Sequence, residues 1–367
     1  MLLIQAKINA KRQSCGYNIY MKKIESEIII ALPEAEENSI DIILEPEPEE
    51  KSYLSSTATI GDTVLFCAAF STVISLIWKF LPDTILPFAK TSLIGFSVIT
   101  LVRLFFSLLL PVMYFSFRFQ IKDIRIMGRN PGIGAVILSF LIGCPTVLIL
   151  VAMHNLLIRF FVSKGISLLL PAFFFASDDV SIESRLLVLA AAFVIPVLLQ
   201  ELFFRGLLFA VWPRSTAVLP KVLVSGLLFA LFMQNPVDFI PLFVLGIILA
   251  YVRQVTDNFV CPVITLISML VTYYMFSSLL PYLDYITVSV TTDPDSVSLY
   301  SAIAALVMSL LAFLPVLSQL RRMSHDTIRI AQIDKETGKE SMRGQFGWTF
   351  GLGLILFATS WVLLLGI

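Results

Sequence analysis

The feature that most constrains this chain is a series of apolar segments, each close to the length that crosses a lipid bilayer. A spanning α-helix needs about 20 mostly apolar residues. Such segments recur at 62–82, 88–116, 132–158, 185–212, 218–233, 238–252, 259–281, 299–319 and 346–366. Hydrophobic residues make up 57% of the chain and charged residues 14%, which is typical of a protein whose solvent is the bilayer. We therefore predict an all-α, polytopic membrane helical bundle with about nine transmembrane helices.

The N-terminal segment differs from the rest of the chain in composition. Between Glu25 and Glu50 it carries ten acidic residues, interrupted by three prolines. Such a segment cannot bury enough apolar surface to offset the entropy lost on ordering. We expect residues 1–60 to form a disordered acidic tail before a transmembrane domain over 61–367. A further apolar stretch, 166–176, is too short to cross and is expected to be interfacial or re-entrant.

Lysine and arginine are unevenly distributed among the loops. They concentrate after the second, fourth, sixth and eighth apolar segments, whereas the loop 282–298 carries three aspartates and no positive charge. Because basic loops remain on the cytoplasmic side, this pattern predicts a cytosolic N-terminus.

Composition also argues against several functions. The net charge is zero, which does not suit a nucleic-acid partner. The four cysteines are scattered singly, and the chain has two histidines, His154 and His325. This distribution supports neither a disulfide framework nor a zinc site. We predict no metal and no cofactor, and we expect His154 to be a satisfied buried histidine.

One apolar segment contains charged residues that need an explanation. Gln200, Glu201 and Arg205 lie within 185–212. Charges at membrane depth are expensive and are usually paired. Because Glu201 and Arg205 are four residues apart, they share one face of a helix and can form a charge-assisted hydrogen bond. Spacing alone leaves two readings open, a structural ion pair and a catalytic group.

Three ordered blocks then resemble a known family. The segment 200–206 resembles the Glu-Glu-x-x-x-Arg signature of the CPBP (Abi) intramembrane endopeptidases. This family includes the type II CAAX prenyl proteases, bacteriocin-processing and immunity proteins, and lysostaphin-resistance-type proteins. The segment 227–233 resembles the family's Phe-x-x-x-His motif. Residues 243–252 and 261–264 resemble the glycine-rich helix and the Trp-Pro-x-Ile that precede its His-x-x-x-Asn motif. The resemblance spans about 185–275.

The resemblance also indicates which residues replace the family's catalytic groups. Gln200 stands where the family has the glutamate that activates water, and an amide cannot accept a proton as a general base. Met233 stands at the histidine of the second motif. Ile267 and Val271, or residues within one position of them, stand at the histidine and asparagine of the third. Glu201 and Arg205 are the polar residues that remain.

The resemblance implies an endopeptidase fold in a membrane, most simply a bacterial inner membrane. Our leading hypothesis is a non-catalytic, pseudoprotease member that binds or regulates membrane or secreted peptides. The first alternative is an active CAAX-type endopeptidase in which Glu201 acts as the base and Arg205 or Gln200 assists the oxyanion. A second alternative is a transporter or channel, which would also account for the helix number and the buried charges.

Overall fold

The computed structural model describes residues 58–80, 93–121, 123–164, 194–212, 218–234, 238–279, 299–323 and 346–365. Nearly all of the predicted acidic tail lies outside the described residues. The same is true of 166–176, the loop 282–298 and His325.

The described residues form helices throughout the membrane part of the chain. The first half contains α3 (Ile60–Phe80), α5 (Leu93–Leu104), the π-helix η2 (Phe105–Leu109), α6 (Leu110–Arg118), α7 (Asp123–Met127) and α8 (Ile133–Ser163). The second half contains α10 (Ile195–Glu201), the π-helix η5 (Leu202–Leu207), α11 (Leu208–Val211), α12 (Val218–Met233), α13 (Phe239–Thr256), α14 (Val260–Leu279), α15 (Leu299–Met323) and α17 (Trp348–Leu365).

Each predicted apolar segment overlaps a helix or a continuous stack of helical elements. Five of them are long and apolar enough to cross a membrane, namely Ile60–Ile77, Thr100–Arg118, Ile133–Phe161, Phe239–Thr256 and Ala302–Arg322. Val218–Met233, Val260–Tyr273 and Trp348–Leu363 are shorter apolar helices. The segment 185–212 is described from residue 194 onward, as α10, η5 and α11. The predicted all-α, polytopic membrane bundle is thus confirmed.

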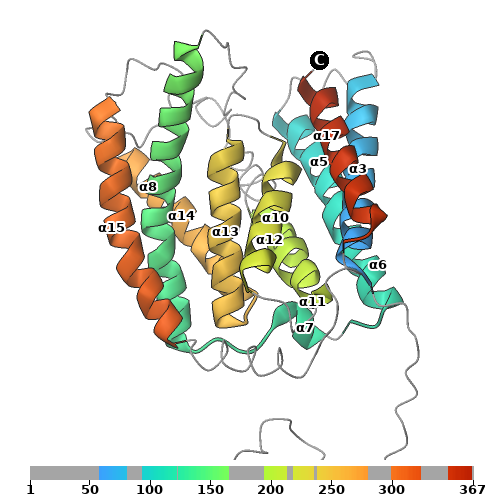
Figure 1. The fold of residues 1–367 in the computed structure, drawn as a ribbon, viewed down its shortest axis with the longest axis horizontal. Coiled ribbons are helices and arrows are strands. Elements are labelled where there is room, and N and C mark those ends of the chain that lie inside the picture. The colour runs from blue at the N-terminus through green and yellow to red at the C-terminus, as the bar shows by residue number, and fades with distance from the viewer. Residues whose placement is uncertain are drawn as a thin grey trace, which may run out of the picture. The chain divides into compact units, whose positions relative to one another are not determined.

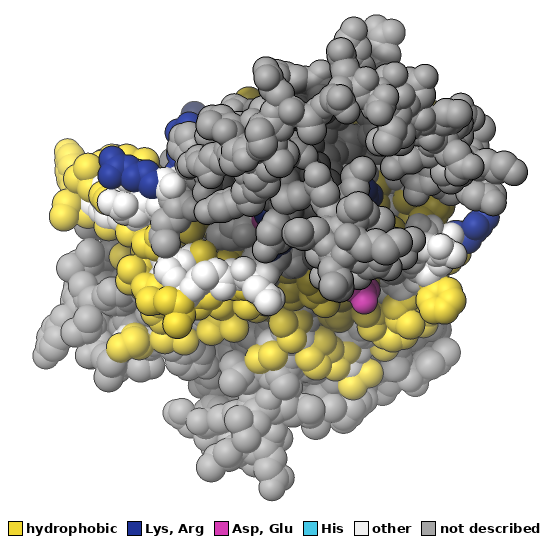
Figure 2. All heavy atoms as spheres, turned by 90° about the horizontal axis from the view of Figure 1, so that it is seen from below, with side chains coloured by type: hydrophobic (Ala, Val, Ile, Leu, Met, Phe, Trp, Pro, Cys, Tyr) yellow, Lys and Arg dark blue, Asp and Glu magenta, His cyan; other side chains and the backbone are white. Residues whose placement is uncertain are grey.

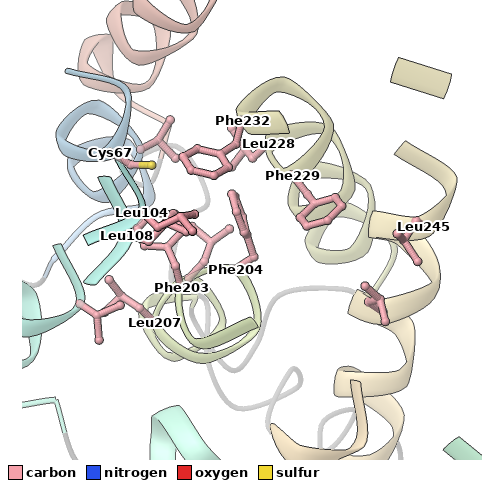
Figure 3. Packing of buried hydrophobic residues seen from close by; sticks show 14 of the residues in the cluster. Cys67, Leu104, Leu108, Phe203, Phe204, Leu207, Leu228, Phe229, Phe232 and Leu245 are labelled. Carbon is pink, nitrogen blue, oxygen red and sulfur yellow. The ribbon is translucent and has the colours of Figure 1, made fainter. Parts of the chain in front are cut away.

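The helices pack in pairs that link distant parts of the sequence (Figure 1). Helix α17 lies along α3, α12 lies along α13, and α8 contacts both α14 and α15. Side chains from most of these helices meet in one large apolar group, which we call the central cluster. Its buried members include Val147, Val151, Phe203, Phe204, Leu207, Leu208, Leu228, Phe229, Phe232, Leu245, Leu249, Leu266 and Met269. Figure 3 shows Phe204 in this cluster between Phe229 and Phe232 of α12, with Phe203 on the side of Leu104 and Leu108.

Several helix ends with basic residues lie on one side of the bundle. Helix α6 ends at Arg118, α15 ends just beyond Arg321 and Arg322, and α7 lies at the same lower side in Figure 1. Figure 2 shows this side, with Lys and Arg side chains at the periphery of a broad hydrophobic surface. The end of α7 is fastened to the residues between α13 and α14, because the Phe259 N–H donates to the Met127 carbonyl at 2.9 Å.

Helices α12 and α13 approach each other closely at a pair of glycines. A Cβ added at Gly246 would lie 2.6 Å from the Cα of Gly226, so the two backbones touch where the helices cross. No flexible side chain stands between them to move aside. The crossing therefore depends on glycine at both positions.

We predict that Gly246→Ala lowers the free energy of unfolding by about 2 kcal/mol, because the added methyl overpacks a backbone contact. Thermal unfolding in detergent micelles would measure the change. Gly351→Ala is the matched control, since a Cβ there meets nothing within 4 Å. If Gly246→Ala lowers the free energy of unfolding no more than Gly351→Ala does, the close backbone contact between α12 and α13 would be contradicted.

Candidate functional site

The charged residues of the fourth apolar segment lie where an α-helix changes into a π-helix. Gln200 and Glu201 end α10, and Arg205 lies within η5. Both Glu201 and Arg205 are fully buried, and Gln200 is 8% exposed. The site is therefore enclosed by protein, at a depth where water cannot solvate the charges.

Glu201 and Arg205 form the ion pair that their spacing predicts. The Arg205 Nη1 donates to Glu201 Oε1 at 2.8 Å, and its Nη2 donates to the Gly246 carbonyl at 3.1 Å. The guanidinium also lies over the Phe229 ring, 4.6 Å from the ring centroid. A carboxylate, a carbonyl and an aromatic face together offset the cost of burying this cation.

Side chains from the neighbouring helices brace the π-helix. A π-turn shifts the backbone hydrogen bonds by one residue, so carbonyl groups within it need other donors. Ser225 of α12 donates to the Phe204 carbonyl at 3.5 Å, and the Arg253 Nε of α13 donates to the Arg205 carbonyl at 2.9 Å. Arg205 of η5 donates to a carbonyl of α13, and Arg253 of α13 donates to a carbonyl of η5. The two arginines therefore hold these elements together.

Arg253 also ties the site to the basic side of the bundle. Its Nη1 donates to Asp257 Oδ1 at 3.1 Å, and its Nη2 lies 3.4 Å from the Arg125 carbonyl of α7. The side chain is buried although it sits near the end of an apolar helix. In the sequence, Arg253 directly follows the predicted segment 238–252 and is one of the basic residues after the sixth segment. Its position next to a long apolar segment was the available signal for burial.

Two atoms of the ion pair retain unused hydrogen-bonding capacity. Among the described residues, Glu201 Oε2 and Arg205 Nε are buried and have no hydrogen-bond partner. Leaving such an atom unsatisfied costs about 1–3 kcal/mol. Glu201 Oε2 is an acceptor only, so a group that donates a hydrogen bond would relieve this cost.

The structure brings together Gln200 and Met233, two of the residues singled out by the sequence. Gln200 Nε2 donates to Met233 Sδ at 3.4 Å, between α10 and α12. The sequence resemblance predicts that these positions match the water-activating glutamate and the second-motif histidine of the family. Neither an amide nor a thioether accepts a proton from water at neutral pH.

The positions that the resemblance assigns to the third motif, Ile267 and Val271, lie four residues apart on one exposed face of α14. Ile267 is 46% exposed and Val271 is 41% exposed. Leu266, one residue before Ile267, is buried in the central cluster with Phe203 and Phe204. Geometry therefore favours Leu266 as the inward residue of this turn, within the one-residue latitude of the alignment. Leucine, like isoleucine, offers no acid, base or hydrogen-bond donor.

The described part of the chain contains no group of three or more His, Cys, Asp or Glu side chains that could hold a metal ion. Cys67, Cys144 and Cys261 are free thiols. Cys144 and Thr272 are hydrogen-bonded to each other at 3.3 Å, on the α8–α14 contact.

The fold and site define a membrane-embedded helical protein with a buried Glu–Arg pair at a helix distortion. Comparison with protein families gives a match over residues 182–272 to the type II CAAX prenyl endopeptidase Rce1-like family. This segment is Rce1-like, and the resemblance to the CPBP family is confirmed. No curated protein and no solved structure matches the chain.

We predict that Arg253→Met lowers the free energy of unfolding by about 1–3 kcal/mol, because it leaves the Arg205 carbonyl and Asp257 without their donor. Thermal unfolding in micelles measures this loss. Arg129→Met is the control: its side chain is 66% exposed and 3.8 Å from Asp257, so its removal should change stability by less than about 0.5 kcal/mol. Equal effects from both variants would show that Arg253 does not brace the site.

We also predict strong coupling between Glu201 and Arg205. Arg205→Met alone should cost about 3–5 kcal/mol, because it leaves a buried carboxylate without its counter-charge. The double variant Glu201→Leu/Arg205→Met should lose less than the sum of the two single variants, because no charge is left unpaired. A double-mutant cycle on unfolding free energies measures the coupling. Additive losses would mean that the two residues are energetically independent.

Proposed function

We propose that this chain is a non-catalytic Rce1-like membrane protein that binds membrane or secreted peptides. The observation that carries the proposal is the Gln200–Met233 contact. It joins the two positions at which the family resemblance places a base and a histidine, and it fills both with side chains that cannot transfer a proton.

Peptide-bond hydrolysis needs a base for the attacking water and donors for the oxyanion, each donor contributing about 3 kcal/mol. Gln200, Met233 and the third-motif positions supply no base. Arg205 could serve as a donor, but its Nη1 and Nη2 are already engaged with Glu201 and Gly246. These contacts favour a stable polar element over a reacting centre.

The site retains a hydrogen-bond acceptor that could bind a peptide. Glu201 Oε2 is a buried acceptor without a partner, and Gln200 lies beside it at the end of α10. A backbone N–H of a bound peptide can donate to a buried carboxylate oxygen. Apolar side chains of the same peptide would be accommodated by the phenylalanines of the central cluster. We further propose that the N-terminus is cytosolic and that the membrane is a bacterial inner membrane.

The test combines peptide capture with a search for cleavage. A photo-crosslinking amino acid at Met233 should form peptide adducts in cells, whereas the same group at Val362, which is 48% exposed on α17, should capture mainly lipid. The peptide N-termini of cells making the natural protein or Glu201→Gln should be identical, because neither hydrolyses peptides. Absence of adducts at Met233 would contradict the binding proposal.

The main competing function is an active endopeptidase with Glu201 as the base. The unpartnered Glu201 Oε2 favours it, because a free carboxylate oxygen in an apolar site is a proton acceptor. New peptide N-termini that appear with the natural protein and vanish with Glu201→Gln would establish this function and overturn the pseudoprotease proposal.

A further inference from the structure

Several cations gather around the carboxylate of Asp257, at the basic side of the bundle. Arg253 Nη1 donates to Asp257 Oδ1 at 3.1 Å, and Arg129 Nε lies 3.8 Å from Asp257 Oδ2. Lys221, near the start of α12, is close enough to interact electrostatically with both Asp257 and Arg253. We call Lys221, Arg129, Arg253 and Asp257 the basic cluster.

The positive charges of the basic cluster exceed its negative charge. Three cations surround one carboxylate, and Arg253 alone already balances that carboxylate through its direct hydrogen bond. On the neighbouring helix α7, the exposed side chains of Asp123 and Arg125 carry opposite charges and leave this excess unchanged. An anion would therefore be attracted to the cluster.

Lys221 is the cation of the cluster that lacks a direct partner. The residue is 7% exposed. Within the described residues its ammonium has only the longer electrostatic interactions with Asp257 and Arg253, without a hydrogen bond or a direct ion pair. A lysine that snorkels to the membrane surface keeps its ammonium in water, whereas burying an ammonium without an acceptor is unfavourable. An anion that accepts hydrogen bonds from Lys221 would remove this cost.

The helix that carries Lys221 also favours an anion at this position. Helix α12 has 16 residues, and Lys221 follows its first residue, Val218, by three positions. The N–H groups at a helix N-terminus carry partial positive charge and attract anions. Side chains lean toward the N-terminus of their own helix, so the Lys221 ammonium lies at the same end as these N–H groups.

The backbone on the other side of the basic cluster is held in place. The Arg129 N–H donates to the Asp257 carbonyl at 2.8 Å, and the Asn258 side-chain amide donates to the Arg129 carbonyl. Gly128 and Asn258 also form a β-bridge. Because these bonds fix the backbone of Arg129 relative to the end of α13, little backbone order has to be gained when a ligand binds.

The basic cluster reaches the surface at Arg129 and Asp257. Their side chains are 66% and 42% exposed, whereas the Arg253 side chain is 4% exposed. Helix α7, whose carbonyls contact Arg253, lies at the lower side in Figure 1. Asp257 directly follows an apolar helix of 18 residues, so the opening lies near the depth of the lipid headgroups.

We propose that the basic cluster binds a phosphate group, with Lys221 and Arg129 donating to its oxygens. Arg253 neutralises Asp257 beside the ligand. A phosphate suits this site because it carries more charge than a carboxylate and accepts several charge-assisted hydrogen bonds. The same chemistry recognises the headgroup phosphate of a lipid and the phosphate of a soluble compound. The proposal does not depend on peptide binding at Glu201.

The experiment measures the rise in unfolding temperature of the full chain in detergent micelles as a probe is added, which gives an apparent Kd. The probes are dioleoyl phosphatidic acid and inorganic phosphate. Dioleoylglycerol, which lacks phosphate, and sodium chloride at matched ionic strength are their controls. At least one phosphate probe should raise the unfolding temperature, and neither control should do so.

Two variants test whether Lys221 binds the probe. Lys221→Met should weaken binding about ten-fold, the effect of one charge-assisted hydrogen bond. Arg322→Met is the matched control, because Arg322 is an exposed cation at the same side of the bundle. It should change the affinity by less than about two-fold.

Asp257→Asn separates a ligand site from a purely structural cluster. Asparagine tolerates the left-handed backbone at this position, where φ is 44°. The substitution should lower the unfolding temperature without ligand, because Arg253 loses its counter-charge. It should nevertheless tighten binding of the phosphate probe about five-fold, because a negative charge beside the ligand is removed. A structural cluster would show only the loss of stability.

The outcomes identify the source of the phosphate or overturn the proposal. A response to phosphatidic acid alone, weakened in Lys221→Met, identifies a lipid headgroup as the ligand. A response to inorganic phosphate that is weakened in the same variant shows that a soluble phosphate is sufficient. If neither probe raises the unfolding temperature, or if Lys221→Met binds as tightly as the natural protein, the proposal is overturned.

Discussion

The burial of Arg205 beside Glu201 is the interaction on which the centre of the structure depends. A guanidinium cannot remain at membrane depth without compensation, and here the compensation comes from three helices. Glu201 supplies the charge, the Gly246 carbonyl accepts a hydrogen bond, and Phe229 supplies an aromatic face. Gly246 is also the residue at which α13 crosses α12 in close contact with Gly226. The helix crossing and the ion pair thus support each other.

The proposed function rests on two features of this site, the retained Glu201–Arg205 pair and the lack of an acid or base at Gln200 and Met233. The buried ion pair and its hydrogen bonds are present, whereas the proposal assigns Gln200, Met233 and Leu266 to positions where proton transfer would be needed. Replacing a base by an amide of similar shape removes reactivity and preserves packing and hydrogen bonding. A scaffold of this kind can hold a peptide in the pose of a substrate and release it uncut.

The sequence predicted the fold well because membrane helices must satisfy their backbone internally, which makes hydropathy a strong guide. It also predicted the Glu201–Arg205 pair, because charge burial and four-residue spacing act locally. It could not predict the π-turn, since no local pattern in residues 202–207 distinguishes it from an α-helix. Nor could it pair His154 with Asp238, which are 84 residues apart and meet only through tertiary packing. For the same reason, the sequence could not show which side of α14 faces the central cluster.

The π-helix η5 affects how a ligand can reach Glu201 and Arg205. Its consecutive residues Phe203, Phe204, Arg205, Gly206 and Leu207 are all buried, whereas Leu202 at its start is partly exposed. Gln200, just before it, retains slight exposure. The guanidinium within this turn has no exposed surface, so a ligand that reaches Glu201 must first displace packed side chains. Such local opening would make association slower than a simple diffusional encounter.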